Sequence, residues 1–206
     1  MPNIISASNL SCNRSERSLF TQLDLQAESG QCLHVVGANG SGKSSLLRIL
    51  CGLLTADEGV IYWNDQPITN NHHYLNELAY IGHKDALKNE LTTVENLQFY
   101  QTCDAKFNED LIDEYLARLD ILECADLLAH QLSFGQRRRL AFARLQIKHY
   151  PIWILDEPFT GIDQSGRGLI ENICLNHCQH DGIIILTNHQ SLQSTKLQPF
   201  LKELVL

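Results

Sequence analysis

The sequence predicts an α/β fold with a mainly parallel core sheet, flanking helices, an antiparallel β lobe and an inserted helical subdomain. The prediction depends on strand-like and helix-like segments that alternate along the chain. Three short runs are apolar on both faces, as buried parallel strands are. These runs are Cys32–Val36, 152–155 and Ile183–Thr187. The strand-like segments expected in the antiparallel lobe are 4–10, 18–28 and 60–64.

Helical patterns account for most of the remaining chain. They cover residues 43–53, 94–102, 109–118, 134–148 and 165–178. Because the stretch 84–148 contains little strand signal, we expect it to form a helical subdomain inserted between two strands of the main sheet. All 206 residues are expected to form a single domain, with the core and β lobe at about 1–83 and 149–206. The last segment, 200–206, is either a terminal strand or a cap on the fold.

The composition is that of an ordinary globular chain, with 44% hydrophobic and 19% charged residues. No apolar run approaches the roughly 20 residues that a membrane-spanning helix needs, and we expect no signal peptide. The net charge of −8 argues against nucleic acid and against direct docking on anionic lipid. Any membrane association is therefore expected to depend on protein partners.

Seven cysteines, an odd number at irregular spacing, indicate reduced thiols in the cytoplasm. Cys174 and Cys178 would share one face of a helix. A metal-binding pair is the alternative there, but buried small apolar residues are the favoured interpretation. The pair His72 and His73 is interpreted as part of a surface loop.

A glycine-rich segment follows the first buried strand directly. Residues 37–44 read G-A-N-G-S-G-K-S, which matches the G-x-x-x-x-G-K-S pattern of a phosphate-binding loop. Glycines let backbone N–H groups converge on phosphate oxygens, and the following helix directs its positive N-terminus at the same anion. A chance glycine-rich turn is the alternative, which the preceding strand and the following apolar helix disfavour. The predicted phosphate-binding residues are Gly37, Ala38, Asn39, Gly40, Ser41, Gly42, Lys43, Ser44 and Ser45.

Within this loop, Lys43 would place its charge at the β- and γ-phosphates, and Ser44 would be a hydroxyl ligand of Mg²⁺. A second buried strand ends in Asp156 and Glu157. Acids at the carboxyl end of a strand face the crevice where open α/β sheets bind ligands. Asp156 is expected to hold Mg²⁺, and Glu157 to orient or deprotonate the attacking water. A solvated acidic turn is the alternative.

Residues 132–136 read L-S-F-G-Q. Ser133 and Gln136 have the spacing of a capping box, so a helix with an accessible N-terminus is expected to start here. Gly135 would let a nucleotide approach the backbone closely. This segment resembles the L-S-G-G-Q signature of ABC ATPases, with Phe134 departing at the third position. The alternative is a plain capped surface helix, with the arginines at 137–139 forming a solvated face.

The resemblance implies a P-loop NTPase with ABC-type architecture that binds ATP and Mg²⁺ and hydrolyses ATP. It implies a nucleotide-dependent head-to-tail homodimer, in which Ser133, Gly135 and Gln136 of one copy contact the ATP of the other. It also places Asp163 near the partner's phosphate-binding loop, and it assigns His189 to the switch that contacts the γ-phosphate.

Two further positions depart from the usual ABC pattern. His83 stands where the family has a glutamine that touches Mg²⁺ and the attacking water, and Arg14 stands where an aromatic residue stacks on adenine. An arginine plane can stack on a base in a similar way. These departures, together with the runs 90–92, 95–97 and 158–160, resemble the ATP-binding subunits of cytochrome c biogenesis systems, which are also called haem exporter ATP-binding proteins.

That narrower resemblance implies integral membrane partners, a peripheral position on the cytoplasmic face of the inner membrane, and a role in delivering haem or its chaperone. The alternatives are an ATPase of another ABC transporter, for a lipid or small molecule, and a non-transport ABC protein acting on DNA or the ribosome. A regulatory nucleotide-binding module without hydrolysis is a third alternative, which the intact Glu157 and His189 disfavour.

Overall fold

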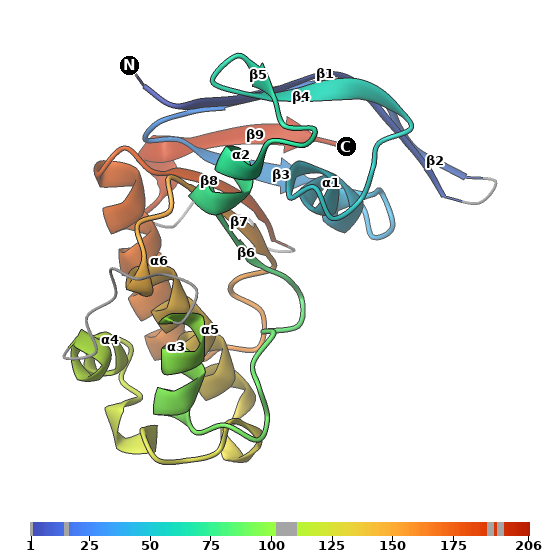
Figure 1. The fold of residues 1–206 in the computed structure, drawn as a ribbon. Helices are drawn as coiled ribbons and strands as arrows, with labels where there is room; N and C mark the ends of the chain where they lie inside the picture. The colour runs from blue at the N-terminus through green and yellow to red at the C-terminus, as the bar shows by residue number, and fades with distance from the viewer. Residues whose placement is uncertain (1, 15–16, 102–110, 189–191, 193–195) are drawn as a thin grey trace. The chain divides into compact units, whose positions relative to one another are not determined.

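The computed structural model describes residues 2–14, 17–101, 111–188, 192 and 196–206. The chain divides into two compact units. The first unit consists of Met1–Tyr80, Tyr150–Pro158 and Cys174–Leu206, and the second of Ile81–His149 and Phe159–Ile173. Both β-sheets belong to the first unit, except for Ile81 at the end of β6, whereas the second unit is built mainly from helices (Figure 1).

The antiparallel sheet has the strand order β2-β1-β4-β5. Its strands are β1 (Ile4–Arg14), β2 (Arg17–Glu28), β4 (Glu58–Trp63) and β5 (Gln66–Pro67). In β1, Ile5 and Ala7 are buried, because alternate side chains of a strand point to the same face. The predicted antiparallel lobe is therefore confirmed, and β1 extends past the predicted residue 10 to Arg14.

The second sheet has the order β6-β7-β8-β3-β9. It contains β6 (Leu78–Ile81), β7 (Ile152–Asp156), β8 (Ile183–Thr187), β3 (Cys32–Val36) and β9 (Leu201–Val205). β3 pairs in parallel with both β8 and β9, and β7 pairs in parallel with β8. The three predicted buried strands are confirmed, and the terminal segment is a strand rather than a cap. The short strand β6 was not predicted.

One hydrophobic core joins both sheets through helix α1 (Lys43–Leu50). Leu46, Leu47 and Leu50 of this helix are fully buried among side chains of β1, β3, β4, β7 and β8. Burial of each leucine contributes about 1.5–3 kcal/mol of hydrophobic stabilisation. α1 ends at Leu50, three residues before the predicted residue 53, and Cys51 caps the helix.

The prediction of a surface loop at His72 and His73 is wrong, because these residues begin helix α2 (His72–Glu77). Asn71 caps this helix by accepting a hydrogen bond from the Tyr74 backbone N–H at 3.1 Å. The Tyr74 ring is fully buried, and its hydroxyl donates to the Leu50 carbonyl at 2.5 Å. α2 is therefore fixed to the end of α1 by the buried Tyr74, which directly follows the two exposed histidines in the sequence.

Helix α6 (Gln164–Gln179) contributes residues to both units. In the first unit its last turns include Cys174 and Cys178, which are buried cysteines outside any disulfide that lie close to Cys32 of β3. Burial raises the pKa of Cys178 to about 12, so this thiol stays protonated. His177 of the same helix stacks on Trp153 of β7, with the ring centroids 3.8 Å apart. The favoured interpretation of the two cysteines as buried apolar residues is confirmed.

The second unit contains helices α3 (Thr93–Gln101), α4 (Ile112–Arg118) and α5 (Phe134–Ile147). Short 3₁₀ turns lie at Leu122–Cys124 and Ala129–Gln131, and another at Gln198–Phe200 in the first unit. Thr92 and Glu95 form a reciprocal capping pair that starts α3. None of the helices in the described ranges is long and apolar enough to cross a membrane.

Candidate active site

The glycine-rich loop connects the end of β3 to the start of α1, as predicted. Gly40 and Gly42 have φ of 77° and 104°, a region that residues with a Cβ rarely adopt. A Cβ on Gly42 would lie 2.9 Å from the Cβ of Leu19, and one on Gly37 would lie 2.6 Å from the Ser41 hydroxyl. The loop therefore requires glycine for both its backbone conformation and its close packing.

Lys43 is the first residue of α1, and it is 8% exposed. Its Nζ donates hydrogen bonds to the carbonyl oxygens of Gly37 and Ala38, at 2.7 Å and 3.0 Å. The ammonium group is thus folded back over the loop that its own helix begins. A phosphate seated on the N-terminal N–H groups of α1 would meet this charge without a large movement of the side chain.

Asp156 is the last residue of β7, and Glu157 follows it directly. Asp156 is 2% exposed, and Thr187 lies beside it at the end of the neighbouring strand β8. The Thr187 hydroxyl donates to Asp156 Oδ1 at 2.7 Å and accepts from the Glu157 backbone N–H at 3.0 Å. Glu157 has φ of 52°, in the left-handed region that non-glycine residues occupy at a cost of about 1–2 kcal/mol. The alternative of a solvated acidic turn is wrong for Asp156, which is buried and bonded.

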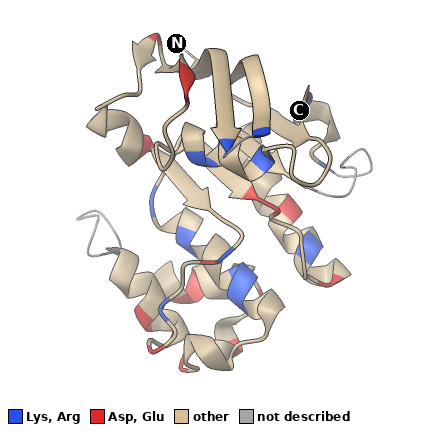
Figure 2. Cartoon of the chain, turned by 90° about the vertical axis from the view of Figure 1, so that its right-hand side faces the viewer, with Lys and Arg blue, Asp and Glu red and all other residues tan. Residues whose placement is uncertain are grey.

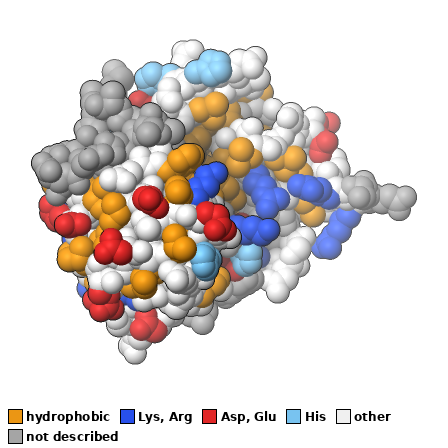
Figure 3. All heavy atoms as spheres, turned by 60° about the horizontal axis from the view of Figure 1, so that its bottom comes forward, with side chains coloured by type: hydrophobic (Ala, Val, Ile, Leu, Met, Phe, Trp, Pro, Cys, Tyr) orange, Lys and Arg blue, Asp and Glu red, His pale blue; other side chains and the backbone are white. Residues whose placement is uncertain are grey.

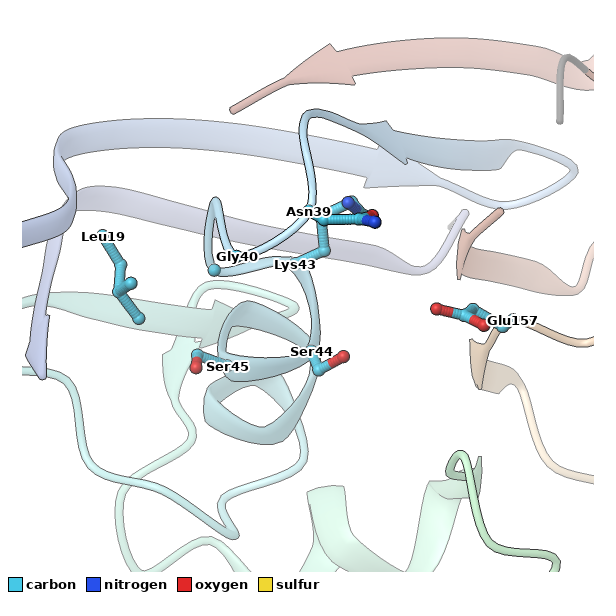
Figure 4. A pocket seen from close by; sticks show the side chains of 8 residues that line it. Leu19, Asn39, Gly40, Lys43, Ser44, Ser45 and Glu157 are labelled. Carbon is cyan, nitrogen blue, oxygen red and sulfur yellow. The ribbon is translucent and has the colours of Figure 1, made fainter. Parts of the chain in front are cut away.

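A pocket of about 390 Å³ brings the loop and the second acid together. Ser44 and Glu157 face each other across it, while Leu19 lies on the opposite side of the loop (Figure 4). The lining residues are Leu19, Asn39, Gly40, Gly42, Lys43, Ser44, Ser45 and Glu157. The pocket combines N–H donors, an ammonium group, a hydroxyl and a carboxylate, which is the set of groups that phosphoryl transfer to water requires.

Ser44 and Asp156 offer a hydroxyl oxygen and a carboxylate oxygen, which are the ligand types that Mg²⁺ prefers. Mg²⁺ normally takes few protein ligands and completes its shell with water and substrate phosphates. The described part of the chain contains no group of three or more His, Cys, Asp and Glu side chains arranged to hold a metal. The oxygen types of Ser44 and Asp156 fit an ion that is shared with a bound nucleotide.

Other predicted site residues do not line this pocket. Arg14 is exposed at the end of β1, opposite Arg17 in the strand register. Arg17 was missed in the sequence, although its Nη1 lies only 3.7 Å from the position that a Cβ of Gly40 would occupy. His83 belongs to the second unit and is exposed. His189 lies outside the residues that the structure describes.

The signature segment lies in the second unit and starts α5 as predicted. Ser133 accepts a hydrogen bond from the Gln136 backbone N–H at 3.2 Å, and Gln136 Oε1 accepts from the Ser133 N–H at 2.8 Å. The predicted capping box is therefore confirmed. Among the described residues, and apart from its chain neighbours and its own helix backbone, the atom nearest to the Cβ position of Gly135 is the Gly161 carbonyl oxygen, at 3.9 Å.

The unusual Phe134 is accommodated by a glycine in the segment that carries Asp163. Its ring, 52% exposed, lies over Gly161, where a Cβ would be only 2.4 Å from a ring carbon. Gly161 also has φ of 71°. Asp163 Oδ1 accepts from the Gly166 backbone N–H at 3.0 Å and so caps the start of α6.

The arginines after the signature are not a solvated face. Arg138 is 2% exposed and forms an ion pair of 2.8 Å with the buried Asp85, and it also donates to the Gly82 carbonyl at 3.0 Å. Arg137 and Arg139 donate to carbonyl oxygens of the second unit. The basic run therefore holds loops of this unit in place, and the alternative interpretation of the run is wrong.

The fold and the site together define a nucleotide-binding protein of the P-loop class. The family model for ABC transporters matches residues 20–160. The chain therefore belongs to the ABC transporter family, and it is an ATP-binding, ATP-hydrolysing member.

Two curated relatives cover almost the whole chain. The cytochrome c biogenesis ATP-binding export protein CcmA of Aliivibrio fischeri is 43% identical over 185 residues, which are 89% of this chain and 91% of the relative. The protein with the same description from Haemophilus influenzae is 44% identical over 196 residues, 94% of this chain and 92% of the relative.

Solved structures share the fold at lower identity. An ABC transporter ATP-binding protein of Pyrococcus furiosus matches with a TM-score of 0.83 and 21% identity, over 98% of this chain and 97% of that one. The ATP-binding subunit of another ABC transporter matches with a TM-score of 0.82 and 20% identity, over 90% of this chain and 79% of that one. The predicted ABC-type α/β fold is confirmed.

Proposed function

We propose that the chain is the ATP-hydrolysing subunit of a membrane ABC complex in cytochrome c biogenesis, where it powers haem export or release of the haem chaperone. The proposal is supported by the relatives of that description, which are 42–44% identical over 89–95% of the chain. The observation that carries the ATPase part is the pocket that joins Lys43, Ser44 and Glu157.

In this proposal the loop of residues 37–42 and the N-terminus of α1 bind the triphosphate, with Lys43 at the β- and γ-phosphates. Ser44 and Asp156 would hold Mg²⁺, which neutralises charge on the phosphate oxygens when it is bound. Figure 3 shows Lys and Arg side chains close together on part of one face, although the overall net charge is −8. Within the pocket itself, Lys43 supplies positive charge that attracts an anionic nucleotide.

Glu157 is proposed as the general base. Its carboxylate accepts a proton from water while the water oxygen attacks the γ-phosphorus, and ADP departs with the electron pair of the broken P–O bond. His189 is proposed to contact the γ-phosphate. His83 is proposed to replace the glutamine that usually touches Mg²⁺ and water, and Arg14 to stack on adenine.

A second copy of the chain is proposed to complete the site. Ser133 accepts a hydrogen bond from the Gln136 N–H, so its own hydroxyl proton remains to be donated to a phosphate oxygen. Gly135 and the N-terminus of α5 would add backbone donors, and Asp163 would lie near the phosphate-binding loop of the other copy. ATP would then bridge the two copies, and hydrolysis would release them.

Integral membrane subunits are the proposed partners, and they would hold the chain on the cytoplasmic face of the inner membrane. Nucleic acid is not proposed as a ligand. Figure 2 shows Lys and Arg interspersed with Asp and Glu on strands and helices, and the net charge is negative. A nucleic-acid-binding domain instead usually presents a continuous basic surface.

The test is to isolate the full chain from detergent-solubilised membranes, identify its companions and measure ATP hydrolysis by the isolated complex. We expect membrane proteins of cytochrome c assembly, and cells lacking the chain should fail to mature c-type cytochromes. Companions that transport a lipid or another small molecule, with normal cytochrome maturation in the deletion strain, would favour the alternative ABC transporter and contradict the proposal.

A further inference from the structure

We propose that Thr187 is a positioning residue for the proposed ATPase reaction, in which one buried hydroxyl sets the orientation of both acids of the site. The inference rests on the proposed roles of Asp156 and Glu157, and from the sequence Thr187 was expected only to end a buried strand. Its side chain is completely buried, and it stands at the end of a strand that is otherwise apolar.

The hydroxyl of Thr187 has one proton, which it donates in a hydrogen bond. The proton is donated to Asp156 Oδ1 at 2.7 Å, while a lone pair of the same hydroxyl oxygen accepts the Glu157 N–H at 3.0 Å. Thr187 therefore holds the Asp156 carboxyl group in a fixed orientation, at the position where the proposal places an oxygen ligand of Mg²⁺.

The second bond acts on the backbone of Glu157. This residue has φ of 52°, a conformation that residues with a Cβ occupy only when the surroundings hold them there. The bond to Thr187 fixes the N–H at the point where β7 ends and the chain turns. The Glu157 carboxylate points into the pocket toward Ser44 from this position (Figure 4).

The strand register explains why one hydroxyl can serve both acids. Asp156 and Thr187 are partners in the parallel pairing of β7 and β8. The side chain of Thr187 therefore lies beside that of Asp156, and the next residue of β7 brings its N–H to the same oxygen. Valine has nearly the same shape as threonine but lacks the hydroxyl, so it would leave both groups buried without this partner.

The experiment compares Thr187→Val, Thr187→Ser and wild type in the full chain with its membrane companions. Thr187→Val should lower kcat by about 10-fold or more, because two hydrogen bonds at the acids are lost. It should also raise the Mg²⁺ concentration for half-maximal activity by at least about threefold, while KM for ATP changes less than about threefold. Thr187→Ser keeps the hydroxyl and should recover most of both losses.

Thr93→Val is the matched control, because Thr93 is also a completely buried threonine and its hydroxyl bonds to the Leu127 carbonyl. This variant should leave kcat and the Mg²⁺ dependence unchanged. If Thr187→Val does not fold, Thr187→Cys replaces it, since a thiol is a weak donor of similar size. Thr187→Cys should likewise lower kcat strongly while KM for ATP changes little.

The inference is overturned if Thr187→Val, or Thr187→Cys in its place, keeps the wild-type kcat and Mg²⁺ dependence. Equal losses in the Val and Ser variants would also overturn it, since packing rather than the hydroxyl would then matter. The activity of Glu157→Gln shows whether a negative result concerns only Thr187 or also the proposed mechanism. If Glu157→Gln is inactive, the role of Glu157 stands whatever the Thr187 variants show.

Discussion

Replacing Gly161 with alanine should destabilise the second unit through its contact with Phe134. The added Cβ would lie 2.4 Å from a ring carbon of Phe134, and the backbone φ of 71° is unfavourable for any residue with a Cβ. The left-handed conformation costs about 1–2 kcal/mol, and overpacking costs about 1–3 kcal/mol. We expect the free energy of unfolding to fall by about 3 kcal/mol in total, which lowers Tm by roughly 6–12 °C in a chain of this length.

The measurement is thermal and urea unfolding of the full chain, in a double-mutant cycle of Gly161→Ala and Phe134→Gly. Because Phe134→Gly removes the clashing ring, it should cancel the packing part of the Gly161→Ala loss and give a coupling of about 1–3 kcal/mol. Gly168→Ala is the matched control, since no atom of the described residues outside the adjoining backbone of α6 lies within 4 Å of its Cβ position. It should leave Tm unchanged or slightly raised.

A Gly161→Ala variant with the wild-type Tm would refute this reasoning. A large loss that Phe134→Gly does not relieve would show that the backbone conformation, and not the ring, is the constraint. The ring contact would then fail to explain how the signature tolerates phenylalanine at its third position.

Three further predictions concern charged groups. Arg17→Ala should weaken ATP binding about 3- to 10-fold, because the Arg17 guanidinium lies beside the loop at Gly40 and can contact phosphate. Calorimetry should show a smaller loss of ATP affinity for Arg14→Ala. Equal losses in the two variants would count against a phosphate contact by Arg17. Asp85→Asn should cost about 3–5 kcal/mol in urea unfolding, because it leaves the buried Arg138 without its counter-charge; a loss below about 1 kcal/mol would show that the pair is not a structural requirement. Burial lowers the pKa of His34 below its ordinary value of 6.5, so the unfolded chain binds the proton more readily than the folded chain. The free energy of unfolding should therefore fall as pH drops through about 6.5. If the free energy of unfolding of His34→Gln falls with the same slope over this pH range, His34 is not the cause.

Local patterns made much of the site predictable. The loop of residues 37–44 needs only a strand before it and a helix after it, and both were recognisable from short runs of sequence. The capping box of Ser133 and Gln136 is likewise a contact between residues three apart. Buried strands such as Ile183–Thr187 are fully apolar except at their ends, so hydrophobicity alone identified them.

The features that were missed depend on contacts between residues far apart in the chain. Thr187 reaches Asp156 and Glu157 only because β8 pairs with β7 in one register. Arg138 looks like one of three surface arginines until Asp85, 53 residues away, is found beside it. The nearest available signal for Thr187 was a hydroxyl residue at the end of an apolar strand, next to another strand that ends in an acid.

The central claim is that Glu157 activates water for attack on ATP held by Lys43 and its loop. Its most direct test is the rate of phosphate release from Mg-ATP by the complex containing Glu157→Gln, measured beside ATP affinity of the same sample. We predict a rate at least about 100-fold below wild type, with ATP affinity within about threefold of wild type. Phosphate release at the wild-type rate by Glu157→Gln would contradict the claim.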